Sequence, residues 1–139
     1  MIGVLIVTHL DLGEKLIEVA ELIMGKQELC KALTIDTSKP MEEILGDIQI
    51  SAKELDRGDG VIILTDMFGG TPSNLSFSLL NSNNLDVITG VNLPMLLKIF
   101  SSRNLPLKEL AEEAKLAGKK GIRVAGEVLK RKVSTNGRQ

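Results

Sequence analysis

Apolar positions along the chain follow two alternating patterns. Residues 2–7 and 61–65 are apolar almost without interruption and rich in β-branched side chains, which is typical of strands covered on both faces of a sheet. Residues 29–35 and 85–89 predict two further strands. Between these runs, apolar residues recur at the spacing of a helix with one buried face. The pattern therefore predicts strands that alternate with helices.

Turn and capping residues mark the ends of the predicted helices. The first helix covers residues 12–24 and stops at Gly25, and the second follows the loop signal at Pro40 and reaches about Leu55. Three more helices are predicted: one from the TPSN stretch to about residue 80, one beginning at Asn92 or Leu93 with Pro94 in its first turn, and one over residues 107–117.

Strands alternating with helices over 139 residues predict a single α/β domain. We expect a doubly wound, mainly parallel sheet with the strand order 2-1-3-4 and helices on both faces. Residues 121–128 predict a short final strand, so the domain is expected to cover residues 1–128. Residues 129–139 form a basic, polar tail that we expect to be flexible.

The composition indicates a core of aliphatic side chains and disfavours several functions. The chain has three Phe and no Trp or Tyr, so Ile, Leu and Val must fill the interior. Its 17 Lys and Arg nearly balance its 18 Asp and Glu, so no overall field attracts nucleic acid or an anionic membrane. The single Cys30 cannot form an intramolecular disulfide, and neither a signal peptide nor an apolar run of about 20 residues is evident. We expect a cytoplasmic protein that reaches a membrane only through a partner.

Two polar clusters follow the strands at residues 2–7 and 61–65. The first contains Thr8, Asp11 and the only histidine, His9, and the second extends over residues 66–74. In an open parallel sheet, ligands bind beyond the carboxyl ends of the strands, at the point where the strand order reverses. Strands 1 and 3 are neighbours at that point in the order 2-1-3-4. We therefore expect His9 and Asp66 to face each other.

These residue types suit phosphoryl transfer. A carboxylate at Asp66 can accept a hydrogen bond from one ring nitrogen of His9, which leaves the other nitrogen free as a nucleophile toward phosphorus. Two glycines allow close approach of backbone N–H groups, the following helix presents its positive end, and hydroxyls add hydrogen bonds without a metal. The expected phosphoryl-binding residues are Gly69, Gly70, Thr71 and Ser73.

The same residues also suit structural roles. A histidine at a strand end is often a solvated loop residue, and the glycines with Pro72 also fit a tight turn between a strand and a helix. From the residues alone, we hold the phosphoacceptor role and the structural role of His9 equally open.

Three stretches of the chain resemble one protein family. IGVLIVTH, VIILTDMFGGTPSN and GVNLPMLL match, in order and spacing, the enzyme IIA (EIIA) proteins of the mannose, fructose and sorbose class of the bacterial phosphoenolpyruvate-dependent sugar phosphotransferase system (PTS). The resemblance extends over residues 1–128, nearly the whole chain. It implies the mannose-type EIIA fold and a role in sugar uptake.

The resemblance also implies roles for particular residues. His9 would be phosphorylated by the HPr phosphocarrier and would pass the phosphoryl group to a separate enzyme IIB protein, with no cofactor or metal. Asp66 would orient His9, and the hydroxyl of Thr71 would contact the phosphoryl group. The family forms homodimers that exchange an antiparallel C-terminal strand, for which residues 121–128 are the candidate. The membrane components IIC and IID would be reached indirectly, and the sugar is not indicated.

Other interpretations of the sequence place the phosphoryl group on a different residue or place the chain in a different pathway. A receiver-type signalling domain would use Asp66 as its phosphoacceptor, but it needs an acidic pair after the first strand to bind magnesium, and this chain has Asp11 alone. The related histidine domain of dihydroxyacetone kinase lacks the GGTP block. A regulator that is phosphorylated without serving a transporter, or a non-catalytic binding module, stays open.

Overall fold

Four parallel strands form the centre of the fold. The computed structural model describes residues 1–67, 69–80 and 84–130. Within these residues the strand order is β2-β1-β3-β4 and every neighbouring pair is parallel, which confirms the predicted order 2-1-3-4. The elements are β1 (Gly3–His9), α1 (Leu12–Met24), β2 (Cys30–Ile35), α2 (Met41–Leu55), β3 (Val61–Thr65), α3 (Thr71–Phe77), β4 (Leu85–Thr89), α4 (Leu93–Ser101) and α5 (Leu107–Lys120).

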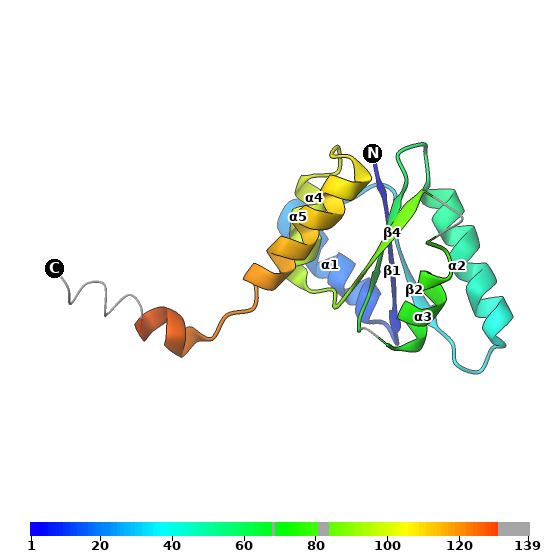
Figure 1. Ribbon diagram of the computed structural model, residues 1–139, viewed down its shortest axis with the longest axis horizontal. Helices are drawn as coiled ribbons and strands as arrows, with labels where there is room; N and C mark the ends of the chain where they lie inside the picture. Colours follow the sequence, from blue (N-terminus) through cyan, green and yellow to red (C-terminus); the bar gives the residue numbers. More distant parts are fainter. Residues whose placement is uncertain (68, 81–83, 131–139) are drawn as a thin grey trace.

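Helices cover both faces of the sheet. Helices α1, α4 and α5 lie on one face, and α2 and α3 lie on the other (Figure 1). Successive residues of a strand point to opposite faces, so Val4 and Ile6 of β1 enter one core cluster while Leu5 and Val7 enter the other. The continuously apolar runs of β1 and β3 are explained by this double coverage.

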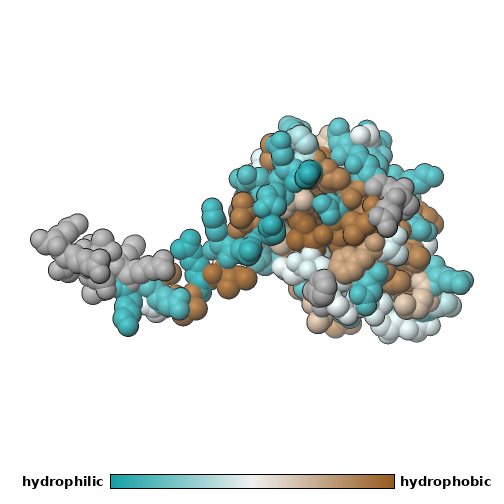
Figure 2. All heavy atoms as spheres, viewed as in Figure 1, coloured by the Kyte–Doolittle hydropathy of each residue, from teal (hydrophilic) through white to brown (hydrophobic). Residues whose placement is uncertain are grey.

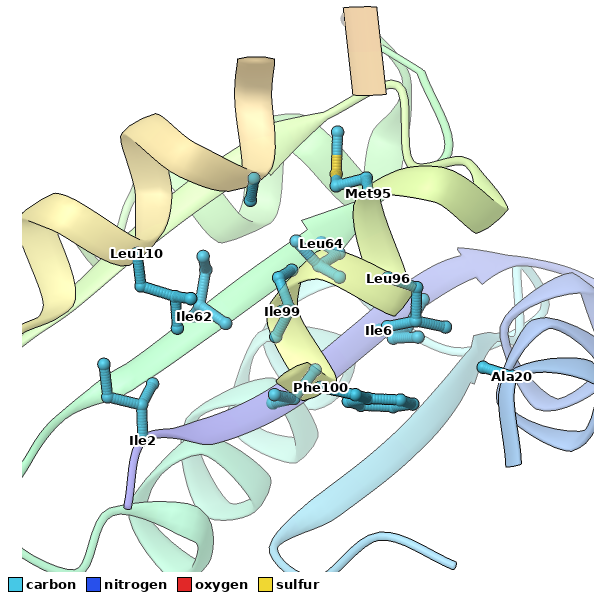
Figure 3. Packing of buried hydrophobic residues seen from close by; sticks show 12 residues of the cluster. Ile2, Ile6, Ala20, Ile62, Leu64, Met95, Leu96, Ile99, Phe100 and Leu110 are labelled. Atoms are coloured by element: carbon cyan, nitrogen blue, oxygen red, sulfur yellow. The ribbon is translucent and has the colours of Figure 1, made fainter. Parts of the chain in front are cut away.

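The first core cluster is built from the sheet and the three helices on the same face, α1, α4 and α5. Side chains of α4 and α5 meet those of β1 and β3 between the two layers (Figure 3). Packing between the layers sets the distance from α4 to the sheet, and it thereby holds the strand ends in a constant position. The residues shown are Ile2, Val4, Ile6, Ala20, Ile62, Leu64, Met95, Leu96, Ile99, Phe100, Leu110 and Ala114.

The predicted C-terminal strand is wrong for the single chain. Residues 122–124 have no regular structure and residues 125–130 are helical, with Val128 N–H donating to the Val124 carbonyl at 3.2 Å. The segment leads away from the sheet (Figure 1), so no neighbouring strand offers it a ladder of hydrogen bonds. Local helical bonds satisfy its backbone instead. The predicted tail at residues 129–139 falls largely on residues 131–139, which lie outside the described residues.

Helix ends agree with the capping signals in the sequence. The Asn92 side chain accepts a hydrogen bond from Met95 N–H at 3.0 Å and caps α4, with Pro94 in the first turn. Gly25 ends α1 with a φ of 92°. None of the helices in the described parts of the chain has the length and apolar composition needed to cross a bilayer.

Candidate functional site

The carboxyl ends of β1 and β3 bring two loops together. The two strands are neighbours, and Val7 of β1 pairs with Thr65, the last residue of β3. His9 ends β1, and Asp66 follows β3 directly. The predicted meeting of His9 and Asp66 at this edge therefore follows from the strand order and register.

One oxygen of Asp66 binds His9 twice. Asp66 Oδ2 accepts the backbone N–H of His9 at 3.0 Å, and it lies 2.8 Å from the ring nitrogen Nδ1. An ionised carboxylate can only accept hydrogen bonds, so Nδ1 carries the proton in this contact. In the neutral ring the other nitrogen, Nε2, then keeps its lone pair. The His9 side chain is 46% exposed, whereas that of Asp66 is 12% exposed, so the base is reachable and its partner is sheltered.

The pKa of the Asp66 carboxyl is the net result of opposing effects. Burial by itself raises this pKa, but the hydrogen bonds from the His9 backbone N–H and ring, together with the ring's charge, hold it below its usual value. The second oxygen, Oδ1, is buried and has no hydrogen-bond partner among the described residues. The carboxylate is therefore ionised at neutral pH, and its bonded oxygen faces His9 alone.

The loop that carries His9 is anchored at both ends. The buried Thr8 hydroxyl accepts Gly13 N–H at 3.0 Å, which ties the end of β1 to the first turn of α1. Leu10 bridges the two with a φ of 47°, in the left-handed region that L-residues seldom adopt. Asp11, which the sequence placed in the same polar cluster, is exposed at the start of α1, and its side chain does not cap the helix.

The loop after β3 places Gly70 against the histidine ring. A Cβ atom on Gly70 would lie 3.3 Å from His9 Cε1, so this glycine packs directly against the imidazole. Gly69 has a φ of 82°, a conformation that suits glycine. Helix α3 begins at Thr71, which is half-buried, with Pro72 in its first turn. The N–H groups of a first helical turn lack intrahelical acceptors, so they make this edge attractive to an anion.

The Ser73 hydroxyl is buried, whereas the sequence analysis expects it to bind the phosphoryl group. Its side chain is buried, its Oγ is 2.6 Å from the buried Thr65 Oγ1, and it donates a hydrogen bond to the Met67 carbonyl. The hydroxyl is thus hydrogen-bonded to the residues on either side of Asp66 and is shielded from solvent. Sequence reasoning missed Thr65, whose only signal was a hydroxyl at the end of an otherwise apolar strand.

The structure brings His9, Asp66 and Gly70 into contact, with Thr71 next along the chain. Within the described residues, no group of three or more His, Cys, Asp or Glu side chains is arranged to hold a metal ion. The arrangement can orient a neutral imidazole, stabilise positive charge on its Nδ1 side and receive an anion beside the ring.

Comparisons with curated proteins identify relatives over most of the chain. The family described as "PTS system fructose IIA component" matches residues 3–115. The fructose-specific EIIA component of Bacillus subtilis (strain 168) is 30% identical over 138 residues, which are 98% of this chain and 94% of that protein. The sorbose-specific EIIA component of Lacticaseibacillus casei is 34% identical over 110 residues, covering 77% and 78%. The mannose-specific EIIAB component of Escherichia coli (strain K12) is 29% identical over 88% of this chain, which spans 39% of that protein.

Solved structures agree with these relatives. The phosphotransferase system component EIIA from Streptococcus agalactiae is 25% identical and superposes with a TM-score of 0.82 over 91% of this chain and 99% of its own. The PTS IIA protein associated with the fucose utilization operon of Streptococcus pneumoniae is 26% identical, with a TM-score of 0.78 over 91% and 95%. The family match, the relatives and the shared fold confirm the resemblance, and the chain belongs to the mannose-type EIIA family, the phosphotransferase components of the sugar PTS.

Proposed function

We propose that the chain is a phosphohistidine carrier that receives a phosphoryl group on Nε2 of His9. The donor is histidine-phosphorylated HPr, and the acceptor is a separate enzyme IIB protein. The observation that carries the proposal is the double contact of Asp66 Oδ2 with His9, because it leaves Nε2 as the free ring nitrogen on a half-exposed side chain.

The transfer itself is a displacement at phosphorus. The lone pair of Nε2 forms a bond to phosphorus while the bond between phosphorus and the donor's nitrogen breaks, and the electron pair of that bond returns to the donor. Positive charge develops on the ring of His9, and the Asp66 carboxylate stabilises it through the proton on Nδ1. Gly70 packs against the ring, and Gly69 and Thr71 adjoin it in the chain; in the proposal these residues supply backbone N–H groups and a hydroxyl to the phosphoryl oxygens. Transfer to enzyme IIB reverses these steps.

The partners place the protein in sugar uptake. Enzyme IIB would pass the phosphoryl group on, and the membrane components IIC and IID would bind the sugar, so this chain would meet only proteins and would act in the cytoplasm. The chain spans 94% of the Bacillus subtilis EIIA component but 39% of the Escherichia coli EIIAB component.

The open edge of β4 supports a homodimer as part of the proposal. Within the described residues, β4 pairs only with β3, and a groove of about 450 Å³ runs between β4 and α5. Hydrophobic surface gathers over β4 (Figure 2), where Val87 and Ile88 are half-buried. The C-terminal segment exposes Ile122, Val124 and Leu129 by 76%, 59% and 63%. A second copy's segment, extended along β4, would bury both surfaces.

Sedimentation would test the dimer. We expect the full chain to sediment as a dimer and the variants Ile122→Asp and Val124→Asp as monomers, because a carboxylate at either position cannot be buried against β4. Monomers at all concentrations of the unaltered chain would contradict this part of the proposal.

Phosphorylation in a reconstituted system would test the carrier function. The protein is incubated with phosphoenolpyruvate, enzyme I and HPr, and the phosphate bound per chain is measured after acid and after base. We expect one acid-labile, base-stable phosphate, absent in His9→Ala and formed slowly in Asp66→Ala. Asp11→Ala is the matched control, because Asp11 is an exposed carboxylate two residues after His9 and its side chain does not bind the His9 ring.

Two results would refute the proposal. Phosphate that persists in His9→Ala excludes a histidine carrier, and phosphate that requires magnesium and disappears only without Asp66 would indicate a receiver-type domain. Transfer from phosphorylated protein to an enzyme IIB would distinguish a transporter component from a regulator.

A further inference from the structure

Two buried hydroxyls lie in the elements on either side of the loop that contains Asp66, one in β3 and one in α3. Thr65 Oγ1 and Ser73 Oγ are 2.6 Å apart, and both side chains are fully buried. Ser73 also donates to the carbonyl of Met67. A hydroxyl has one proton to donate, so Ser73 must accept from Thr65 while it donates to Met67. The two bonds therefore run in one direction, from the end of β3 through α3 to the loop.

The two bonds hold the backbone on both sides of Asp66. Thr65 precedes Asp66 and Met67 follows it, and both are tied to the same atom of Ser73. Apart from the two hydrogen bonds from His9 to Oδ2, no hydrogen bond fixes the carboxylate, because Oδ1 has no partner in the part of the chain that the structure describes. The direction in which Oδ2 points thus depends on the backbone, and the backbone depends on Ser73.

We propose that Ser73 and Thr65 are positioning residues that hold Asp66 against His9 and thereby select the ring form in which Nε2 is unprotonated. The inference rests on the proposed function for its effect on phosphoryl transfer. Both hydroxyls are fully buried and hydrogen-bonded to each other, so neither is placed to contact the phosphoryl group. Ser73 consequently acts through the loop and not as the phosphoryl ligand that its place in the sequence suggests.

Ser76 provides a matched control. It lies on the same short helix, is also fully buried, and donates its hydroxyl to a carbonyl, that of Pro72, at 2.7 Å. Ser73→Ala and Ser76→Ala each remove one buried hydroxyl that donates to a carbonyl, and Ser73→Ala also removes the acceptor of the Thr65 hydroxyl. Only the Ser73 bond reaches the loop that contains Asp66, so a difference between the variants isolates positioning from stability.

The readouts are the histidine ring and the pH dependence of phosphorylation. His9 is the only histidine, so the imidazole ¹⁵N signals of the full chain come from one residue. These signals are compared among the unaltered protein, Ser73→Ala, Thr65→Val, Thr65→Ser and Ser76→Ala, together with the phosphorylation rate from HPr at several pH values. Thr65→Val keeps the side-chain shape and removes the hydroxyl, and Thr65→Ser keeps the hydroxyl.

We expect the unaltered protein, Ser76→Ala and Thr65→Ser to hold the neutral ring with its proton on Nδ1. Ser73→Ala and Thr65→Val should show a mixture of the two neutral ring forms and a rate lower by roughly tenfold or more. Weaker bonds from His9 allow the pKa of Asp66 to rise toward its usual value, so the part of the pH dependence that follows protonation of Asp66 should move to a higher pH in these two variants.

Two outcomes separate this inference from the proposed function. If Ser73→Ala and Thr65→Val match Ser76→Ala in ring form, rate and pH dependence while His9 is phosphorylated, the positioning role is wrong and the carrier function stands. If His9 is not phosphorylated in the unaltered protein, the carrier function is wrong, and the ¹⁵N signals still decide the positioning role. Should Ser73→Ala fail to fold, Thr65→Val carries the same comparison.

Discussion

Two leucines share the same unusual backbone conformation, and they allow the free-energy cost of that conformation to be measured in the loop that carries His9. Leu10 and Leu29 both have a φ of 47°, and they are the non-glycine residues with positive φ in the described chain. A left-handed backbone costs an L-residue roughly 1–2 kcal/mol, and glycine avoids this cost but loses about 0.5–1 kcal/mol through its freedom in the unfolded chain. Replacement by glycine should therefore gain about 0.5 kcal/mol wherever the side chain packs against nothing.

The two leucines differ in what their side chains contact. Leu10 is 78% exposed, so Leu10→Gly should leave the free energy of unfolding unchanged or raise it by about 0.5 kcal/mol. Leu29 is half-buried against the second core cluster. Losing that contact costs about 2–3 kcal/mol, so Leu29→Gly should lower the free energy of unfolding by about 2 kcal/mol after the backbone gain.

Urea unfolding of both variants measures this difference. We expect the midpoint for Leu10→Gly to lie at or above that of the unaltered protein and the midpoint for Leu29→Gly well below it, with similar slopes. Equal losses in the two variants would refute the reasoning, because they would mean that the Leu10 side chain packs as tightly as that of Leu29. A gain in both would mean that backbone strain outweighs burial at each position.

Three further predictions concern titratable groups. The pKa of Asp66 is lowered in the folded protein, so its ionised form adds stability that is complete above the ordinary value near 4 and is lost as the pH falls through the lowered value. The stability difference between the unaltered protein and Asp66→Asn should therefore shrink in urea titrations as the pH falls below about 4. Burial raises the pKa of the Cys30 thiol to about 12, so at pH 8 it should react with iodoacetamide at least about 100-fold more slowly in the folded chain than in urea, and similar rates would contradict its burial. Arg103 is 5% exposed and donates to the Ile2 carbonyl through Nε and Nη2 at 2.9 and 2.6 Å, so Arg103→Met should lower the free energy of unfolding by about 2–4 kcal/mol, and a loss below about 1 kcal/mol would contradict this role.

The elements that could be predicted are those whose signals are local. The strand limits at residues 61–65 and 85–89 agree with the structure, because a covered strand needs an unbroken apolar run and polar turns delimit both. The expected strand at residues 121–128 failed because a strand requires a partner, and pairing is not written in the segment itself. Helix α5 extends to Lys120, three residues beyond the predicted end at residue 117, because its backbone hydrogen bonds continue over one more turn.

The candidate site, like the fold, could be predicted only in part from the sequence. The meeting of His9 with Asp66 follows from the strand order, which the alternation of elements already indicates. The direction of the Ser73 hydroxyl could not be predicted, because it depends on the path of the loop that precedes α3. No sequence signal marked Arg103 either, since it donates to the backbone carbonyls of Ile2 and Leu29, 101 and 74 residues earlier, and any residue carries a carbonyl.

A carrier must release the phosphoryl group that it receives, and the charges around His9 suit release. Residues 8–14 and 65–74 contain no Lys or Arg, so neither loop supplies a fixed cation against the phosphoryl oxygens. Such a cation would strengthen the hold on the phosphoryl group and slow its departure. Asp66 instead contacts the Nδ1 side of the ring, away from Nε2, where in the proposed transfer it would stabilise the ring's positive charge while the group arrives and while it leaves. An arrangement that favours the transition state in both directions without trapping the phosphorylated form is what distinguishes a relay from a storage site.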